Sequence, residues 1–171
     1  AFAAGLTAVL EERGVVPAAA AGLSLGEYSA LHAAGVFDAR TAVGLTAFRG
    51  RAMEEAAAGR ESAMMAVLGM GRELLQAACD EAAALGCVTI ANYNCPGQLV
   101  IGGERAAVER AAALAKEKGA KRCLPLNVSG PFHTPLMAPA GEALREYFKG
   151  IDFAAPRIPV VFNCLGDTAG G

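Results

Sequence analysis

The sequence lacks several features that would assign it to a large class of proteins at once. It has no excess of basic residues, with 15 Lys and Arg against 17 Asp and Glu and a formal net charge of −2. A nucleic-acid-binding face needs clustered positive charge, so we expect no nucleic acid partner. No apolar run approaches the roughly 20 residues that cross a bilayer, and no basic segment precedes an apolar one near Ala1. We therefore expect neither a membrane anchor nor a signal segment within these residues.

The sequence also lacks paired cysteines. The five cysteines are odd in number and form no Cys-x-x-Cys pair, which argues against a disulfide framework or a zinc site. Their neighbours are largely apolar, so we interpret all five as reduced, buried thiols of a cytoplasmic protein. They are Cys79, Cys87, Cys95, Cys123 and Cys164.

What is present is ample material for a folded core, because 54% of the 171 residues are hydrophobic. Helical periodicity covers residues 1–13, with Gly14 as its end signal. The apolar run at 15–23 suits a buried strand before Ser24. Further helices are expected at 25–34 and at 38–58, the latter capped by Asp38.

The middle of the chain has a different pattern of expected helices and strands. Residues 62–126 alternate between strand-like and helix-like segments in the order βαββαβ, with a hairpin centred on Pro96 and Gly97. This order predicts a ferredoxin-like subdomain inserted into a larger α/β layer. A helix at about 139–148 and the Val-rich strand "IPVVFN" then return to that layer. We expect three segments, namely 1–60, 61–127 and 128–171.

Ser24 stands between Gly22 and Gly26 in a G-x-S-x-G pattern, after a candidate strand and before a candidate helix. This pattern is typical of a sharp bend that projects a nucleophilic serine. The helix that begins at Leu25 would aim its backbone N–H groups at a developing oxyanion, with the Leu25 amide as first donor. The alternative is that Ser24 is a plain helix N-cap.

A serine nucleophile needs a base, and the sequence offers two histidines. His32 lies eight residues along the same expected helix, about 12 Å up its axis at 1.5 Å per residue, and cannot reach Ser24. His133, in the Pro-flanked loop "GPFHTPLM", is left as the candidate. No acidic residue between positions 24 and 133 occupies a loop after a core strand, which weakens the case for an ordinary hydrolase triad.

Arg49 interrupts an apolar helical stripe formed by positions 42, 45, 49, 52 and 56. A guanidinium on such a face is costly unless an anion satisfies it. It could clamp a substrate carboxylate with its planar fork, pair with an internal carboxylate, or cover apolar surface with its stem. Arg51 points away from this stripe and is expected to be solvated.

Taken together in order and spacing, these segments resemble the malonyl-CoA:acyl carrier protein transacylases of fatty acid and polyketide synthesis. "GLSLGEYSALHAAG" resembles the nucleophile segment, "FRGRAMEEA" the arginine segment, "ANYNCPGQLVIGG" the hairpin that lines the cleft, and "GPFHTPLM" the histidine segment. The resemblance spans nearly the whole chain. It implies an incomplete α/β-hydrolase-like core around the inserted ferredoxin-like subdomain.

The resemblance also implies roles for individual residues. Ser24 would attack the thioester, Leu25 would supply an oxyanion amide, and His133 would act as general base. Arg49 would hold the malonyl carboxylate, and Phe132 and Asn94 would contact substrate, Phe132 disfavouring branched acyl chains unless it is simply a core aromatic. The acyl group would pass from coenzyme A to Ser24 and then to the phosphopantetheine thiol of acyl carrier protein, without metal or further cofactor.

Three departures from the family pattern accompany this resemblance. Leu23 stands where most relatives carry histidine. The family's opening strand, with a second oxyanion donor, is expected before Ala1, and the segment whose amide orients the histidine is expected after Gly171. Loss of one oxyanion donor typically costs about 10² to 10³ in rate, so we expect this stretch by itself to be nearly inactive.

Two alternatives stay open beside a monomeric, cytoplasmic transacylase. A serine hydrolase or thioesterase would use the same bend with water as acceptor. A noncatalytic carrier-protein-binding fragment would use the cationic segment around Lys118, although cations at a helix C-terminus are also favoured by the helix dipole.

Overall fold

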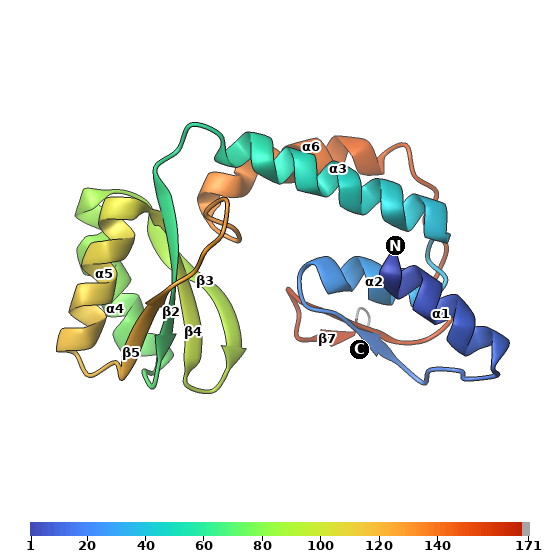
Figure 1. Ribbon diagram of the computed structural model, residues 1–171, viewed down its shortest axis with the longest axis horizontal. Coiled ribbons are helices and arrows are strands. Elements are labelled where there is room, and N and C mark those ends of the chain that lie inside the picture. The colour runs from blue at the N-terminus through green and yellow to red at the C-terminus, as the bar shows by residue number, and fades with distance from the viewer. Residues whose placement is uncertain (169–171) are drawn as a thin grey trace. The chain divides into compact units, whose positions relative to one another are not determined.

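The computed structural model describes residues 1–168 and has α/β architecture (Figure 1). Its internal contacts divide the chain into two compact units. Unit 1 comprises residues 1–50 and the residues from 145 onward, and unit 2 comprises residues 51–144. The long helix α3 (Ala39–Ala57) and the helix α6 (Ala138–Phe148) each contribute to both units.

Unit 1 is built on a small mixed sheet with the strand order β1-β6-β7. Strands β1 and β6 are parallel, with Ala20 opposite Val160, and β7 is antiparallel to β6. The elements of this unit, besides its parts of α3 and α6, are α1 (Phe2–Glu12), β1 (Ala20–Ala21), α2 (Leu25–Ala33), β6 (Val160–Phe162) and β7 (Asp167–Thr168).

The helix limits in unit 1 follow the sequence signals. Gly14 (φ 74°) and Gly35 (φ 79°) adopt the left-handed conformation just beyond α1 and α2, as expected of glycine at helix ends. The Asp38 Oδ1 atom accepts a 2.7 Å hydrogen bond from the backbone N–H of Thr41, so Asp38 caps α3 as predicted.

The strand expected at 15–23 is much shorter in the structure. It is confined to Ala20–Ala21, while Val15 and Val16 are exposed. Pro17 has no N–H to donate to a ladder, and alanine has little strand propensity. The expected buried strand is therefore wrong over most of its length, although strand pairing does precede Ser24.

The core of unit 1 forms where α2 and α3 pack against β6 and the end of α6. Leu45 and Val160 are almost fully buried in it. On its edge, the Phe48 and Tyr147 rings stack with their centroids 4.1 Å apart, which fixes the end of α6 on α3.

Unit 2 contains a four-stranded antiparallel sheet with the order β3-β4-β2-β5. Its elements follow in the βαββαβ order that the sequence predicts, and Pro96 and Gly97 form the two-residue hairpin loop between β3 and β4. The elements are β2 (Ser62–Leu68), α4 (Arg72–Ala82), β3 (Val88–Cys95), β4 (Gln98–Glu104), α5 (Arg105–Glu117) and β5 (Arg122–Pro125).

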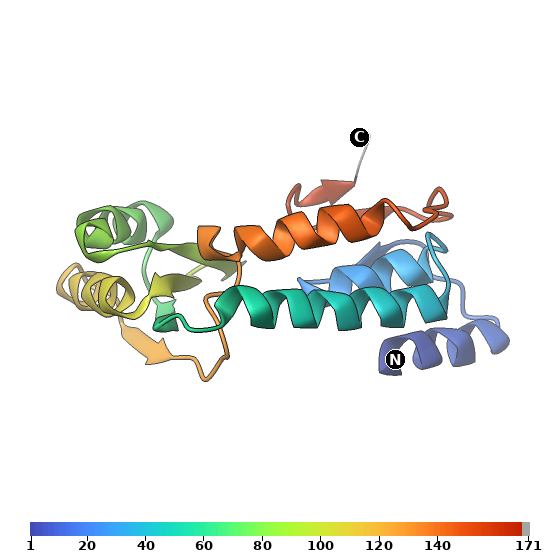
Figure 2. The same cartoon turned by 90° about the horizontal axis from the view of Figure 1, so that it is seen from above.

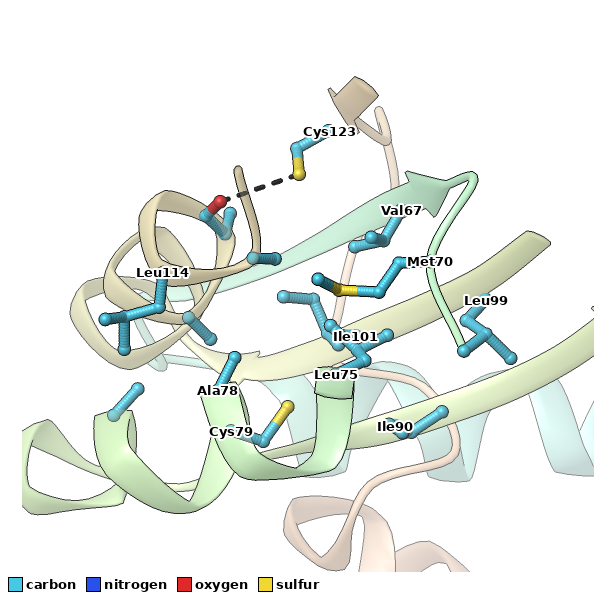
Figure 3. Packing of buried hydrophobic residues seen from close by; sticks show 14 of the residues in the cluster. Val67, Met70, Leu75, Ala78, Cys79, Ile90, Leu99, Ile101, Leu114 and Cys123 are labelled. Atoms are coloured by element: carbon cyan, nitrogen blue, oxygen red, sulfur yellow. Dashed lines mark hydrogen bonds between the residues drawn. The ribbon is translucent and has the colours of Figure 1, made fainter. Parts of the chain in front are cut away.

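Helices α4 and α5 lie side by side on one face of this sheet (Figures 1 and 2). Between them and the strands is the larger hydrophobic core of the chain, in which Leu75, Ile101 and Val67 are fully buried (Figure 3). Burial raises the pKa of the Cys79 thiol to about 11, so this side chain stays protonated at neutral pH.

The five cysteines do not share one environment, and the expectation that all of them are buried is wrong. Cys79 and Cys123 are buried, and the Cys123 thiol donates to the Ala112 carbonyl over 3.6 Å (Figure 3). Cys95, the last residue of β3 before the hairpin loop, and Cys164, in the turn after β6, are exposed, because hairpin ends and turns lie at the surface. No helix within residues 1–168 is both long enough and apolar enough to span a membrane.

Candidate active site

Ser24 lies on a strained bend between β1 and α2. Its backbone has φ 50° and ψ −104°, and although Ser24 is the N-cap residue of α2, its side chain makes no capping hydrogen bond to the helix, so the hydroxyl does not act as a plain helix cap. A Cβ atom on Gly22 would lie 2.1 Å from the Gly26 carbonyl carbon, so the bend closes only where residue 22 has no side chain. These features are those of a bend that presents the serine.

His133 shares this rare backbone conformation. Among residues 1–168, Ser24 and His133 (φ 60°) are the non-glycine residues with positive φ. Such strain persists where the surroundings impose it, and it clusters at functional sites. At His133 the loop is braced by the buried Thr134, whose hydroxyl donates to the Pro131 carbonyl over 2.6 Å.

Arg49 reaches Ser24 across unit 1. Its Nη2 atom donates a 2.7 Å hydrogen bond to Ser24 Oγ, and its guanidinium carbon lies 5.9 Å from the centroid of the Tyr28 ring. The other positions of its stripe are buried, as the periodicity predicts. Within the part of the chain that the structure describes, no carboxylate forms an ion pair with Arg49, which removes the structural ion-pair alternative there. A half-buried cation therefore adjoins the candidate nucleophile.

Tyr28 forms the wall next to this cation. Burial raises the pKa of its hydroxyl, while the charge of Arg49 acts in the opposite direction. The ring is thus neutral at physiological pH and offers its face to the guanidinium, a contact that orients the fork without neutralising its charge.

Asn163, at the carboxyl end of β6, is a site residue that sequence reasoning missed. Its Oδ1 atom accepts from the Ser24 backbone N–H over 2.6 Å, and its Nδ2 atom donates to the Gly22 carbonyl. Its own backbone N–H donates to Glu27 Oε2 over 3.2 Å. The signal in the sequence was slight, namely an amide side chain at the end of a strand expected in the core layer.

The remaining candidates divide between the two units. Leu25 is the first residue of α2, so its N–H has no acceptor within the helix, and its role as an oxyanion donor stays a prediction. His32 Nδ1 bonds the Phe37 carbonyl over 3.0 Å, a structural role that agrees with its exclusion as base. His133 belongs to unit 2 and is exposed. That His133 lies within hydrogen-bond reach of Ser24 stays a prediction.

Phe132 and Asn94 also lie in unit 2. Phe132 packs against Met64, Ala66 and Val100 on the sheet face opposite α4 and α5, so the ring has at least a structural role. Asn94 is exposed near the hairpin, at a register irregularity between Tyr93 and Cys95. Bulges of this kind re-aim side chains, often beside functional sites. Their contact with substrate is likewise a prediction.

The bend, the serine and the adjoining guanidinium on an α/β scaffold define a class of acyl-transferring proteins, and comparison with protein families agrees. Residues 1–168 match the acyl transferase domain family, and the chain belongs to that family.

Individual relatives make the comparison more specific. The chain is 49% identical over 164 residues to the malonyl CoA-acyl carrier protein transacylase of Bacillus subtilis, a match that covers 94% of this chain and 52% of the relative. Its fold resembles that of the acyl-carrier-protein S-malonyltransferase of Burkholderia pseudomallei, with a TM-score of 0.93 and 44% identity. This match covers 99% of this chain and 55% of the solved one. It also resembles a malonyl-transacylase solved in complex with a type II PKS acyl-carrier protein, with a TM-score of 0.90 and 45% identity. This match covers 94% of this chain and 52% of the solved one. The chain thus spans about half the length of the relatives it matches.

Proposed function

We propose that the protein containing this chain transfers a malonyl group from coenzyme A to the phosphopantetheine thiol of an acyl carrier protein. The observation that carries the proposal is the 2.7 Å hydrogen bond from Arg49 to the hydroxyl of a serine on a strained bend. The names of the relatives, which are malonyl transacylases, support the same substrate and partner. The fatty acid and polyketide pathways both use this reaction.

In the first half-reaction, the Ser24 hydroxyl attacks the thioester carbonyl carbon while its proton passes to His133. The tetrahedral oxyanion is stabilised by the Leu25 N–H at the start of α2. Collapse of this intermediate expels the coenzyme A thiolate, which takes the proton from His133. The product is a malonyl ester on Ser24 and free coenzyme A.

Arg49 selects the acyl group in this scheme. In a malonyl ester on Ser24, one methylene separates the carbonyl carbon from the free carboxylate. A guanidinium that already bonds Ser24 Oγ is therefore within reach of that carboxylate, which the two N–H groups of the fork can bind together. An acetyl group has no carboxylate and leaves the half-buried cation without its anion.

The second half-reaction repeats the first with the carrier thiol as nucleophile. His133 takes the thiol proton, the thiolate attacks the malonyl ester, and Ser24 leaves with the proton restored. Because one thioester is replaced by another, the overall free energy of the exchange changes little. The reaction uses the coenzyme A thioester as substrate with no further cofactor.

The finer architecture belongs to the same proposal. We assign unit 1 to an incomplete α/β-hydrolase-like core and the antiparallel sheet with α4 and α5 to a ferredoxin-like subdomain, which the strand order β3-β4-β2-β5 supports. We propose 1–60 and 128–171 as the segments of the core and 61–127 as the inserted subdomain, which lies within unit 2 and is shorter than it at both ends. We further propose a monomer that acts in the cytoplasm, with Phe132 and Asn94 facing the acyl group.

Mass spectrometry of the full-length protein after exposure to malonyl-CoA or acetyl-CoA tests the function. We expect a malonyl adduct on Ser24 that accumulates faster than the acetyl adduct and is discharged by holo acyl carrier protein. Ser24→Ala should abolish the adduct. Discharge by water as fast as by carrier protein would support a hydrolase instead, and carrier binding without any adduct would support a noncatalytic fragment.

Arg49→Ala, with the exposed Arg51→Ala as matched control, tests the selectivity. Hydrogen bonds to charged groups contribute about 1.5–3 kcal/mol, so Arg49→Ala should lower the malonyl to acetyl ratio roughly 10- to 100-fold. Arg51→Ala should leave the ratio within twofold. An unchanged ratio in Arg49→Ala would remove the carboxylate clamp from the mechanism.

A further inference from the structure

The Asn163 side chain holds both sides of the nucleophile bend at once. Its amide oxygen accepts from the Ser24 N–H and its amide nitrogen donates to the Gly22 carbonyl. The two bonded backbone groups flank residue 23. The Asn163 backbone N–H donates instead to Glu27 Oε2, on the first turn of α2.

The strand register explains why a side chain takes this place. Ala20 pairs with Val160 and Ala21 with Val161, so the same register would set residue 23 opposite residue 163. In a parallel ladder, a residue donates to the carbonyl before its partner and accepts from the N–H after it. The Asn163 amide makes these two bonds around residue 23, in place of its own peptide groups.

Backbone pairing cannot continue to this point because the chain leaves the strand conformation. Ser24 has φ 50° and ψ −104°, and Gly22 is pressed against Gly26. A side-chain amide carries the same donor and acceptor as a peptide but stands off the main chain by one methylene, so it can follow the bend where a strand cannot.

We propose that Asn163 is a positioning residue that extends the β1-β6 ladder through the bend and so holds Ser24 in its strained, reactive conformation. The proposal rests on Ser24 being the nucleophile. Asn163 itself touches backbone groups of the bend, whereas Arg49 touches the hydroxyl. Loss of the amide should therefore reduce the reactivity of Ser24 and leave the carboxylate clamp in place.

The isosteric variant Asn163→Asp, made in the full-length protein, tests this role. Its carboxylate keeps an acceptor for the Ser24 N–H but turns a second oxygen toward the Gly22 carbonyl, in place of a donor. We expect kcat for malonyl transfer to fall at least 10-fold, with KM for malonyl-CoA within about threefold of the wild type. Labelling of Ser24 by a fluorophosphonate, which needs neither malonyl group nor carrier protein, should slow by the same factor.

A pH profile separates positioning from a general loss of structure. Protonation of the N163D carboxyl restores a donor for the Gly22 carbonyl, so the labelling rate relative to wild type should rise as the pH is lowered. Asn127→Asp, at an exposed loop position, introduces the same charge and should label at the wild-type rate at every pH. Thermal melting of all variants reports the folded fraction.

Each result bears on the proposal. Labelling of N163D at the wild-type rate, a pH-independent deficit, or a deficit equal to its unfolded fraction would overturn the positioning role. If the wild type transfers no malonyl group but is labelled faster than N163D, the proposed function fails while the positioning role stands. If fluorophosphonate does not label wild-type Ser24, the hydroxyl is not reactive and both fail.

Discussion

Gly22 and Gly26 flank Ser24 symmetrically in sequence but not in space. A Cβ on Gly22 would lie 2.1 Å from backbone atoms of Gly26, whereas a Cβ on Gly26 would have no described atom within 4 Å beyond its chain neighbours and the backbone of its own helix. Gly22→Ala must therefore displace the bend, and a displacement near 1 Å can cost about 10² in rate. We expect fluorophosphonate labelling of Ser24 to fall about 100-fold in Gly22→Ala.

Gly26→Ala is the matched control for this substitution. Residue 26 lies in α2, where alanine is favoured over glycine by about 0.8–1 kcal/mol, so labelling should stay within threefold of wild type and stability should rise slightly. Equal labelling rates in the two variants would mean that the bend does not depend on the close approach at residue 22.

Single site residues could be predicted where the pattern that marks them lies in the neighbouring sequence. Arg49 stood out because helical periodicity places it on a buried stripe, and Ser24 because two glycines surround it. Asn163 had no such signal, since its partners are backbone groups 139 and 141 residues away. A side chain that completes a strand ladder is recognised once the register is known, and register is not a local property.

At the scale of elements, the start of α3 is a local feature with a testable energy. The Thr41 N–H donates to the Asp38 carboxylate, and this hydrogen bond lowers the pKa of that carboxyl. Because the folded pKa lies below the unfolded one, the cap stabilises the protein above the unfolded pKa near 3.9 and loses this effect as the pH falls through the folded pKa. Asp38→Ala should lower the melting temperature at pH 7, by less than a buried leucine truncation, and the difference from wild type should shrink in acid.

Asp38→Asn separates the cap from the charge. Asparagine caps helices about as well as aspartate and does not titrate, so this variant should melt close to wild type at pH 7 and show no acid-dependent loss from this site. A melting curve of Asp38→Ala that matches wild type at pH 7 would show that α3 begins without help from this side chain.

The elements that the sequence predicted well are those with their own start and end signals. Helices α2 and α3 have a bend or cap before them, and Gly35 lies between them. The hairpin at Pro96 and Gly97 is equally local. Strand β1 was overestimated because its length is set by its parallel partner β6, some 140 residues later, and not by the apolarity of its own residues.

At the scale of the whole molecule, the two units have separate hydrophobic cores. Leu45 belongs to the core between α2, α3 and β6, and Leu75 to the core between α4, α5 and the antiparallel sheet. The two clusters have no residue in common among the residues described. The sequence predicted an inserted unit from a change in segment order, but it gave no means of telling which part of α3 serves which core.

Truncation of these two leucines tests whether the cores are energetically separate. Each side chain is at most 1% exposed, so Leu45→Ala and Leu75→Ala should each cost about 2–5 kcal/mol of unfolding free energy. Because they share no partners, the double variant should lose the sum of the two within about 0.5 kcal/mol, measured by chemical denaturation and added over both transitions if the units unfold in turn. Leu75→Ala combined with Ile101→Val, within one core, is the control and should deviate from additivity by more than that. Coupling between Leu45→Ala and Leu75→Ala as large as in this control would mean that the two units stabilise each other through the helices they share.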